Sequence, residues 1–312
     1  MQKRKIILDC DPGYDDAVAL LLAAGNPKID LLAITVVAGN QTIDKVTKNA
    51  LAIAGIAGLK DVPIARGAVR PLLRQPETAS FIHGVSGLDD TTLPDDLPEV
   101  DPRHAAQLII DIVMREPAGT VTLVPTGPLT NIALAVRLEP RIVERVKEVV
   151  LMGGACHYGN HGPYSEFNIA NDPEAAQIVF SEPWKVVMVG LDLTYQARAT
   201  DEVVNRIREV KTKSGVFLTE VLDAFNQRYR KVRGHSDAPV HDPCAVAYVI
   251  DPTVVEAQPV PIAVELTGTL TAGMTVADFR RPAPEDCHTW AALKLDQARF
   301  WDLVTEAVER LP

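Results

Sequence analysis

The sequence has few cysteines, no long hydrophobic run and no excess of positive charge. Its four cysteines are scattered without C-x-x-C spacing, which disfavours a disulfide framework or a zinc site and predicts buried free thiols in a reducing compartment. No apolar run approaches the length of a membrane span. The formal net charge of −10 argues against nucleic acid or an anionic membrane as the main partner and favours a small, weakly charged substrate.

The N-terminus carries no recognisable export signal. Lys3, Arg4 and Lys5 are followed by only three apolar residues before Asp9, too few for a signal-peptide core, so we expect a cytoplasmic protein. Hydrophobic residues make up 47% of the 312, which is enough for a sizeable core without disulfides or structural metal ions. No repeat, low-complexity tract or clear linker divides the chain, and a single domain over residues 1–312 is expected.

Short apolar, β-branched runs alternate with helical stretches along the chain. The runs expected as strands are Lys5–Cys10, Leu31–Val37, Val121–Pro125, Val149–Met152 and Val186–Val189. The stretches expected as helices are Asp15–Ala24, Lys45–Ile56, His104–Met114, Leu129–Leu138, Pro173–Phe180 (capped by Asp172) and Gln297–Leu311. This alternation predicts an α/β fold: a mostly parallel, open Rossmann-like sheet flanked by helices.

Two segments depart from this alternation. Residues 200–236 look helical and could form a lid over the active site. Residues 70–101 are rich in Pro, Asp and Thr and are expected to be a long loop outside this alternation, called the excursion below.

Polar and glycine-rich residues follow several predicted strands. The first strand leads into an aspartate-rich turn, the second into Gly39 and Asn40, and the third into Thr126 and Gly127. Ligands in open parallel sheets bind at the carboxyl ends of the strands. We therefore expect the active site at this edge of the sheet.

The aspartate-rich turn contains four carboxylates within eight residues: Asp9, Asp11, Asp15 and Asp16. Carboxylates so close together repel one another unless a cation lies among them, and oxygen ligands without neighbouring His or Cys favour Ca²⁺ or Mg²⁺. The alternative is a solvated acidic loop in which Asp15 caps the next helix. The spacing alone does not separate these two interpretations.

Several blocks together resemble a known family. The turn Asp9–Ala17 has the form Asp-x-Asp-Pro-Gly-x-Asp-Asp-Ala. Further blocks follow in order: Ala38-Gly39-Asn40, His83-Gly84 with Gly87-Leu88-Asp89, Pro125–Asn131, Met152-Gly153-Gly154, Glu166–Ala175 and His241-Asp242. With these blocks the chain resembles the inosine–uridine-preferring nucleoside hydrolases from residue 5 to about residue 250.

This resemblance implies the nucleoside hydrolase fold and an enzyme that splits ribonucleosides, pyrimidine or purine, into free base and ribose. It also implies one Ca²⁺ per chain and a homodimer or homotetramer. The implied metal ligands are Asp11, Asp15, Asp16, the backbone carbonyl of Thr126, and Asp242. Asn40, Asn160, Glu166 and Asn168 would hold the ribose, with His83 near the base and His241 as the acid.

The chemistry assigns roles to a few of these residues. Cleavage of the C–N bond builds positive charge on the sugar and negative charge on the base. Asp11 is expected to take the proton of the attacking water, which the metal would orient together with the ribose hydroxyls. Asp15 and Asn168 would meet the 2′- and 3′-hydroxyls, Glu166 and Asn160 the 5′-hydroxyl. Asn40, opposite the aspartates, is expected to contact the sugar in the catalytic centre.

Four aromatic or imidazole side chains have two interpretations each. His241 suits proton donation to the leaving base, although it could instead cap the helix from Pro243. His83, in an exposed-looking loop, is either a pocket residue or a plain loop histidine. Tyr229 and Phe167 either contact the base or pack within the protein.

Two other functions are compatible with the aspartates. A Mg²⁺-dependent phosphohydrolase would need a cationic group for the phosphoryl, and no Lys or Arg lies inside the matched blocks. A nucleoside-binding protein without turnover would not need both Asp11 and His241. The preference between pyrimidine and purine bases stays open, since it depends on residues 75–90 and 220–240.

Overall fold

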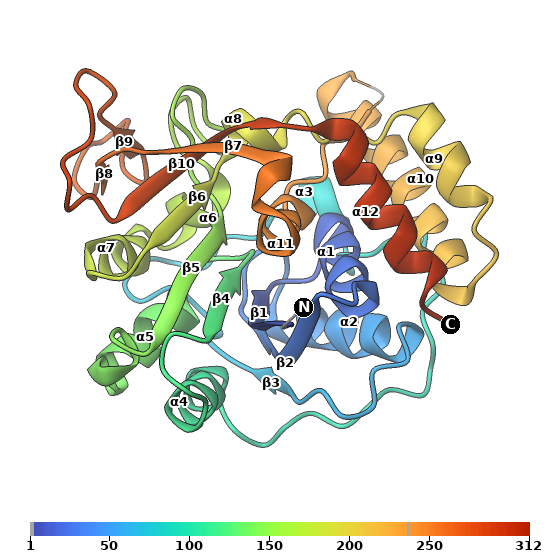
Figure 1. Ribbon diagram of the computed structural model, residues 1–312. Coiled ribbons are helices and arrows are strands. Elements are labelled where there is room, and N and C mark those ends of the chain that lie inside the picture. The colour runs from blue at the N-terminus through green and yellow to red at the C-terminus, as the bar shows by residue number, and fades with distance from the viewer. Residues whose placement is uncertain (1–2, 236) are drawn as a thin grey trace.

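The computed structural model describes residues 3–235 and 237–312 (Figure 1). Its centre is an eight-stranded sheet in the order β3-β2-β1-β4-β5-β6-β10-β7, parallel except for β7 against β10. These strands are β1 (Arg4–Cys10), β2 (Ile29–Val36), β3 (Ile64–Arg66), β4 (Val121–Pro125), β5 (Val146–Met152), β6 (Val186–Val189), β7 (Val255–Pro259) and β10 (Thr289–Leu295). A two-stranded sheet of β8 (Ile262–Val264) and β9 (Thr275–Ala277) forms an arm at one end (Figure 1).

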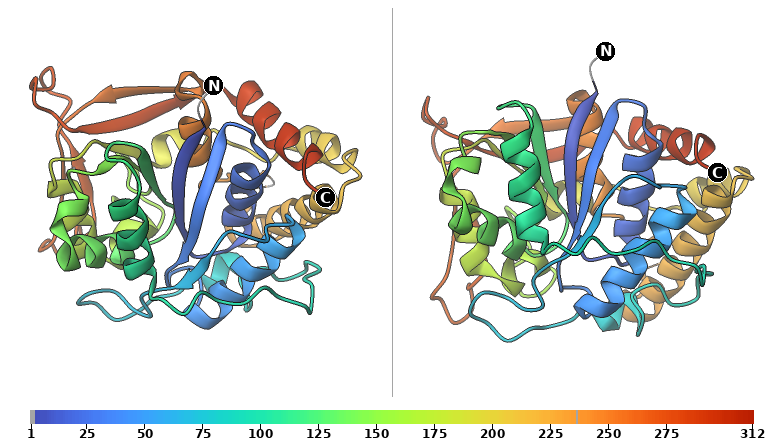
Figure 2. Two further views of the ribbon diagram at one scale, coloured as in Figure 1. Left: turned by 60° about the horizontal axis from the view of Figure 1, so that its bottom comes forward. Right: turned by 90° about the horizontal axis from the view of Figure 1, so that it is seen from below.

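Helices cover both faces of the sheet (Figure 2). One layer contains α1 (Tyr14–Gly25), α2 (Ile43–Ile56), α9 (Asp201–Arg208), α10 (Lys213–Arg233), α11 (Pro243–Ile250) and α12 (Gln297–Glu309). The other contains α4 (Ala105–Arg115), α5 (Thr130–Leu138) and α7 (Pro173–Ser181). Three short helices, α3 (Ser80–His83), α6 (Phe167–Asn171) and α8 (Leu191–Thr194), lie in the loops between these elements.

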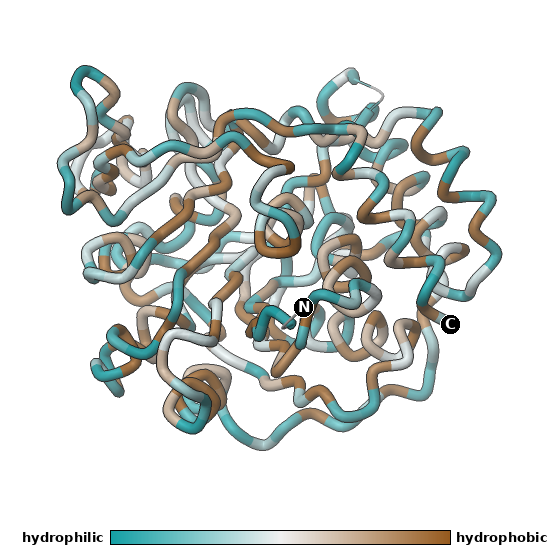
Figure 3. The backbone as a smooth tube through the Cα atoms, in the orientation of Figure 1, coloured by the Kyte–Doolittle hydropathy of each residue, from teal (hydrophilic) through white to brown (hydrophobic). Residues whose placement is uncertain are grey.

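The burial pattern explains this layering. In β1, residues 6–10 are all buried, because both faces of a parallel sheet are covered by helices. In α4, Leu108, Ile109, Ile112 and Val113 are buried at the spacing of one helix face. Figure 3 shows hydrophobic residues concentrated on the strands and on the inward sides of the helices. The core therefore consists of two apolar layers with the sheet between them.

The register of three central strands brings their carboxyl ends level. Asp9 of β1 pairs with Thr35 of β2 on one side and with Pro125 of β4 on the other. The loops that begin at Asp11, at residue 37 and at Thr126 therefore leave the sheet side by side. The predicted convergence of polar residues at one edge follows from this alignment.

The predicted α/β fold is confirmed, and each predicted strand and helix corresponds to an observed one within a few residues. Residues 200–235 contain α9 and α10, whereas residue 236 of the proposed lid lies outside the described ranges. Residues 70–101 form the predicted excursion, with α3 as its helix. No helix in the described part of the chain combines the length and apolarity needed to cross a membrane.

Candidate active site

Three carboxylates from two distant segments meet at the sheet edge. Asp15 and Asp16, in the first turn of α1, and Asp242, which precedes α11, each offer an oxygen within 4.8 Å of the others. All three side chains are buried. The alternative of a solvated acidic loop is therefore wrong, and Gly13, not Asp15, occupies the N-cap of α1.

Hydrogen bonds from backbone and side chains hold these carboxylates in place. Asp16 accepts from the Gly13 amide at 3.0 Å and from the Thr126 hydroxyl at 2.9 Å. Asp15 accepts from the His241 amide at 3.3 Å. Segments more than 200 residues apart in sequence are thereby joined through one carboxylate.

Asp11 lies beside this group but outside the 4.8 Å set. Its Oδ2 accepts from the Asn40 amide at 2.6 Å, while its buried Oδ1 has no partner among the described residues. The loop backbone approaches so closely that a Cβ at Gly39 would collide with Oδ2. Glycine at this position is therefore what allows Asn40 to reach the Asp11 carboxylate.

Burial and mutual repulsion disfavour the ionised form of this cluster. Burial raises the pKa of Asp15 to about 7, with a further contribution from Asp16, and raises the pKa of Asp11 and Asp242 well above the usual range. Within residues 3–235 and 237–312, no Lys or Arg forms an ion pair with these carboxylates. The buried Oδ1 atoms of Asp11 and Asp15 lack hydrogen-bond partners in the same ranges. A divalent cation would satisfy these oxygens and offset the repulsion.

The Thr126 carbonyl, which was predicted as a metal ligand, makes a hydrogen bond with Asn168. The Thr126 carbonyl accepts from Asn168 Nδ2 at 2.8 Å, which leaves its second lone pair available. The same amide reaches the Met152 carbonyl at 3.2 Å. Asn168 thus connects the ends of β4 and β5 at the cluster.

A cavity opens to solvent above the carboxylates, with about 700 Å³ of empty space when its open mouth is included. Its lining includes every predicted substrate-binding residue: Asp15, Asn40, His83, Asn160, Glu166, Phe167, Asn168, Tyr229 and His241. Further lining residues were not predicted from the sequence, and they include Phe81, Ile82, His161, Tyr195, Phe225 and Arg233. A cavity with carboxylates at one end and rings around it suits a sugar joined to a flat base.

Glu166 and Asn160 also support the local backbone. The Glu166 carboxylate accepts from the amides of Gly154, Asn168 and Ile169, so that it caps α6. Burial raises its pKa to about 7 although these hydrogen bonds lower it. Asn160 Oδ1 accepts from the Phe167 amide at 2.9 Å. Both residues therefore hold the loop that carries Phe167 and Asn168.

The His241 ring faces the cavity and does not cap a helix. Its Nδ1 lies 2.7 Å from the hydroxyl of Thr194, and Asp242 occupies the N-cap position of α11. The edge of the ring meets Tyr195 with centroids 5.5 Å apart. Burial lowers the pKa of His241 to about 4, so the ring is neutral near pH 7 and is a strong proton donor once it has been protonated. The alternative of a capping histidine is therefore wrong.

His83 is buried and does not lie in an exposed loop. It ends α3, and its Nδ1 accepts from the Tyr14 amide at 3.3 Å. Its ring packs against those of Tyr14 and Phe225, at 5.8 and 6.1 Å, and these two rings lie 5.3 Å from each other. Burial lowers its pKa to about 3, which favours the neutral ring that this hydrogen bond requires. The exposed-loop prediction failed because the excursion folds back over α1.

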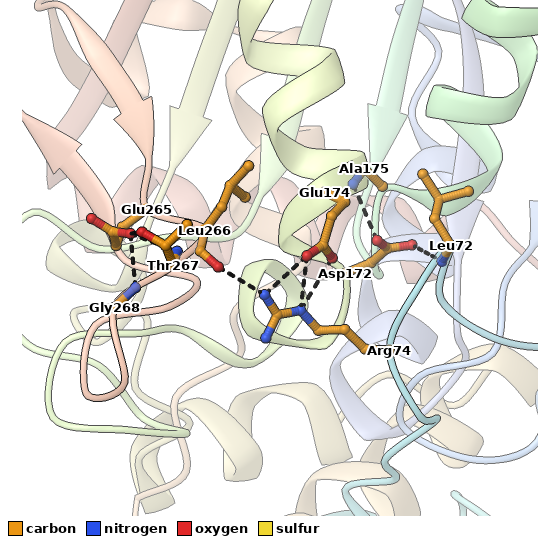
Figure 4. A network of polar contacts seen from close by, with 9 residues as sticks. All are labelled: Leu72, Arg74, Asp172, Glu174, Ala175, Glu265, Leu266, Thr267 and Gly268. Atoms are coloured by element: carbon orange, nitrogen blue, oxygen red, sulfur yellow. Dashed lines mark hydrogen bonds and ion pairs between the residues drawn. The ribbon is translucent and has the colours of Figure 1, made fainter.

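Long-range polar contacts hold this excursion against the rest of the protein. Arg74 forms an ion pair with Glu174 of α7 at 3.0 Å and donates to the Leu266 carbonyl near the arm (Figure 4). The Leu72 amide donates to Asp172, the predicted cap of α7 (Figure 4). Arg228 of α10 donates to the carbonyls of Ser80 and Phe81. The wall that carries His83 is therefore fixed at both ends.

A buried contact beneath the cluster was also missed. Asp9 Oδ1 accepts from the Thr35 hydroxyl at 2.6 Å and from Asn131 Nδ2 at 2.8 Å, and Asn131 Oδ1 accepts from the Ala68 amide. Both Asp9 and Asn131 lie within the matched blocks, but their pairing joins residues 122 apart. Asp9 therefore ties strand ends together beneath the other aspartates.

Comparisons with known proteins agree with this geometry. The family model described as "Inosine-uridine preferring nucleoside hydrolase" matches residues 6–302. The chain is 59% identical to a protein of that description from Crithidia fasciculata, covering 99% of this chain and 98% of the relative. It is 41% identical to a pyrimidine-specific ribonucleoside hydrolase from Shewanella woodyi, with 98% of each chain covered. The solved structure of a purine-preferring ribonucleoside hydrolase from Gardnerella vaginalis superposes with a TM-score of 0.92 at 34% identity, covering 98% of each chain.

Proposed function

We propose a role for each site residue from the premise that this chain belongs to the inosine–uridine preferring nucleoside hydrolase family and hydrolyses ribonucleosides to free base and ribose. The observation that carries the proposal is a group of buried carboxylates at the end of a ring-lined cavity, with no cationic partner among the residues that the structure describes. Family membership sets aside the phosphohydrolase and the binding protein without turnover.

One Ca²⁺ would be held by oxygen atoms alone. The proposed ligands are Asp11, Asp15, Asp16, the Thr126 carbonyl and Asp242. The unpartnered oxygens of Asp11 and Asp15 and the absence of His or Cys from the cluster support a hard cation. When bound, the ion would orient the ribose hydroxyls and a water molecule and make that water more acidic.

Asp11 is the proposed base that takes the proton of the attacking water. Its carboxylate is held by the Asn40 amide at 2.6 Å, and burial raises its pKa, which favours proton uptake. Asn40 lines the cavity next to Asp11 and belongs to the same catalytic group. Asp15 and Asn168 would bind the 2′- and 3′-hydroxyls of the ribose.

The other end of the ribose would meet Asn160 and Glu166. Asn160 Oδ1 is engaged by the Phe167 amide, so its Nδ2 would serve the 5′-hydroxyl. Glu166 would accept with lone pairs that its backbone donors leave unused. His241 is the proposed acid for the leaving base, while Tyr229, Phe167 and His83 would line the base pocket.

The remaining proposals concern organisation. We propose a single domain in which α10, within the proposed lid, covers the cavity, since Tyr229, Phe225 and Arg233 of α10 line it. A homodimer or homotetramer is proposed from the family resemblance, and a cytoplasmic location from the four free cysteines, which suit a reducing compartment.

A panel of ribonucleosides assayed for free base and ribose, with and without a chelator, tests this function. We expect turnover that a chelator abolishes and added Ca²⁺ restores. Uridine should be strongly preferred over 2′-deoxyuridine, because buried groups built for a hydroxyl reject an analogue without it by up to about 10⁴-fold. Comparable kcat/KM for the two substrates would contradict the proposed ribose contacts.

A further inference from the structure

A fully buried threonine lies beside the proposed acid. Thr194, the last residue of α8, is 0% exposed, and its Oγ1 lies 2.7 Å from Nδ1 of His241. Among the residues that the structure describes, this is the hydroxyl's only hydrogen-bond partner. Nε2, the second ring nitrogen, has none there, and His241 lines the cavity. The threonine thus engages one nitrogen and leaves the other for a ligand.

The position of Thr194 is set by elements outside the carboxylate cluster. Asp192 of α8 accepts from the Cys156 amide at 2.6 Å, which ties the helix to the loop after β5. Gln196 donates to the Asp192 and Leu293 carbonyls, both at 2.8 Å, and accepts from the Leu295 amide. Because Leu293 and Leu295 belong to β10, these contacts fix α8 to the central sheet.

We propose that Thr194 is a positioning residue that turns the His241 ring so that Nε2 points toward the leaving base. This inference rests on the acid role of His241 proposed above. A hydroxyl can donate to Nδ1 of a neutral ring and accept from the Nδ1–H of a protonated one. The ring therefore keeps one orientation before and after it gives up a proton.

The orientation of the ring matters in the step that cleaves the glycosidic bond. As the C1′–N bond breaks, its electron pair goes to the base, and the base accepts the proton from His241 Nε2. The water oxygen forms the new bond to C1′, and its proton goes to Asp11. A rotated ring would still be present but would leave Nε2 out of reach of the base, because proton donors act within about 3.2 Å of their targets.

The test compares Thr194→Val, which keeps the shape but removes the hydroxyl, with Thr194→Ser, which keeps the hydroxyl. Each is assayed on inosine, whose base needs a proton, and on p-nitrophenyl riboside, whose leaving group needs none. We expect Thr194→Val to lower kcat for inosine by about tenfold, the value of one or two hydrogen bonds, and to change p-nitrophenyl riboside turnover by less than about twofold. Thr194→Ser should restore inosine turnover to within about threefold of the parent enzyme.

Two controls accompany the pair. Thr305→Val removes another buried hydroxyl, which donates to the Trp301 carbonyl of its own helix, and should leave the turnover of both substrates unaffected. His241→Ala should lower inosine turnover by about 100-fold or more and spare p-nitrophenyl riboside. Adding Thr194→Val to His241→Ala should cause no further loss, because the two residues act as one unit.

Three outcomes would overturn the inference. Equal losses on both substrates with Thr194→Val would assign the residue to packing, and unchanged inosine turnover would assign it no role. If His241→Ala shows a selective loss on inosine, either of these two results would reject the positioning role of Thr194 and leave the acid role of His241 standing. A His241→Ala enzyme without selective loss would reject the acid role and this inference together.

Discussion

The carboxylate end of the cavity and its ring-lined wall are built in opposite ways. The carboxylate end comes from turns that leave adjacent strands at one level, and its side chains are buried and bonded within the cluster. The wall comes from α3 and α10, which lie far from each other in sequence and are joined by partly exposed arginine contacts such as Arg228 with Ser80 and Phe81. In the proposed mechanism, the chemistry common to all ribonucleosides lies at the carboxylate end, and base recognition lies on the wall.

The strongest test of this comparison removes the proposed base from the carboxylate end. Asp11→Asn keeps the shape and the hydrogen bond from Asn40 but cannot take a proton. We expect kcat to fall by about 10²–10⁴-fold on every ribonucleoside and on p-nitrophenyl riboside alike. Steady-state kinetics check this, with the exposed Asp302→Asn as a matched control. A loss confined to some bases would contradict the proposed division.

Removal of the cation should destabilise the carboxylate end. Ca²⁺ in excess should raise the free energy of unfolding by about 2.7 kcal/mol at a concentration 100 times its Kd. With chelator, stability should increase as pH falls from about 7 towards 3.8, because Asp15 has a raised pKa and the folded state binds more protons in that window. Thermal unfolding at several pH values, with chelator or Ca²⁺, measures both effects. A pH dependence that is identical in the two conditions would argue against a cation at this cluster.

A change in the wall should alter selectivity more than chemistry. Tyr229→Ala removes a ring that lines the cavity from α10 and should change the ratio of kcat/KM for inosine and uridine by about tenfold, as loss of one aromatic contact allows. Turnover of p-nitrophenyl riboside should respond less. The exposed Tyr158→Ala serves as the control. An unchanged ratio would place base recognition elsewhere in the wall.

The smallest expected effect comes from loosening the wall without changing its lining. Arg228→Gln weakens the contact of α10 with the carbonyls of Ser80 and Phe81. We expect KM to rise by about threefold with kcat nearly unchanged, since a partly exposed hydrogen bond contributes about 1 kcal/mol or less. Arg208→Gln, which breaks an exposed ion pair with Asp223, is the matched control. A large fall in kcat would mean that the wall also positions catalytic groups.

The sequence alone was sufficient to predict which residues gather at the carboxylate end of the cavity. The run from β1 into α1 has the apolar pattern of a buried parallel strand, and three turns with polar residues follow neighbouring strands. Parallel strands place their carboxyl ends at one edge, so Asp11, Asn40 and Thr126 could be brought together without coordinates. The family blocks added Asp242 from the far end of the chain.

Only the tertiary structure decided how the other residues are used. Burial of His83 depends on an excursion pinned by Arg74 and Arg228, and the capping role of Glu166 depends on a loop that folds onto Gly154. The pairing of Thr194 with His241 joins residues 47 apart through one hydroxyl. Local periodicity reports which face of a strand or helix is buried, but it carries no information about which distant side chain meets which. Those pairings are set by the packing of whole elements, and they decide the protonation, orientation and exposure of the groups that we propose to act on the base.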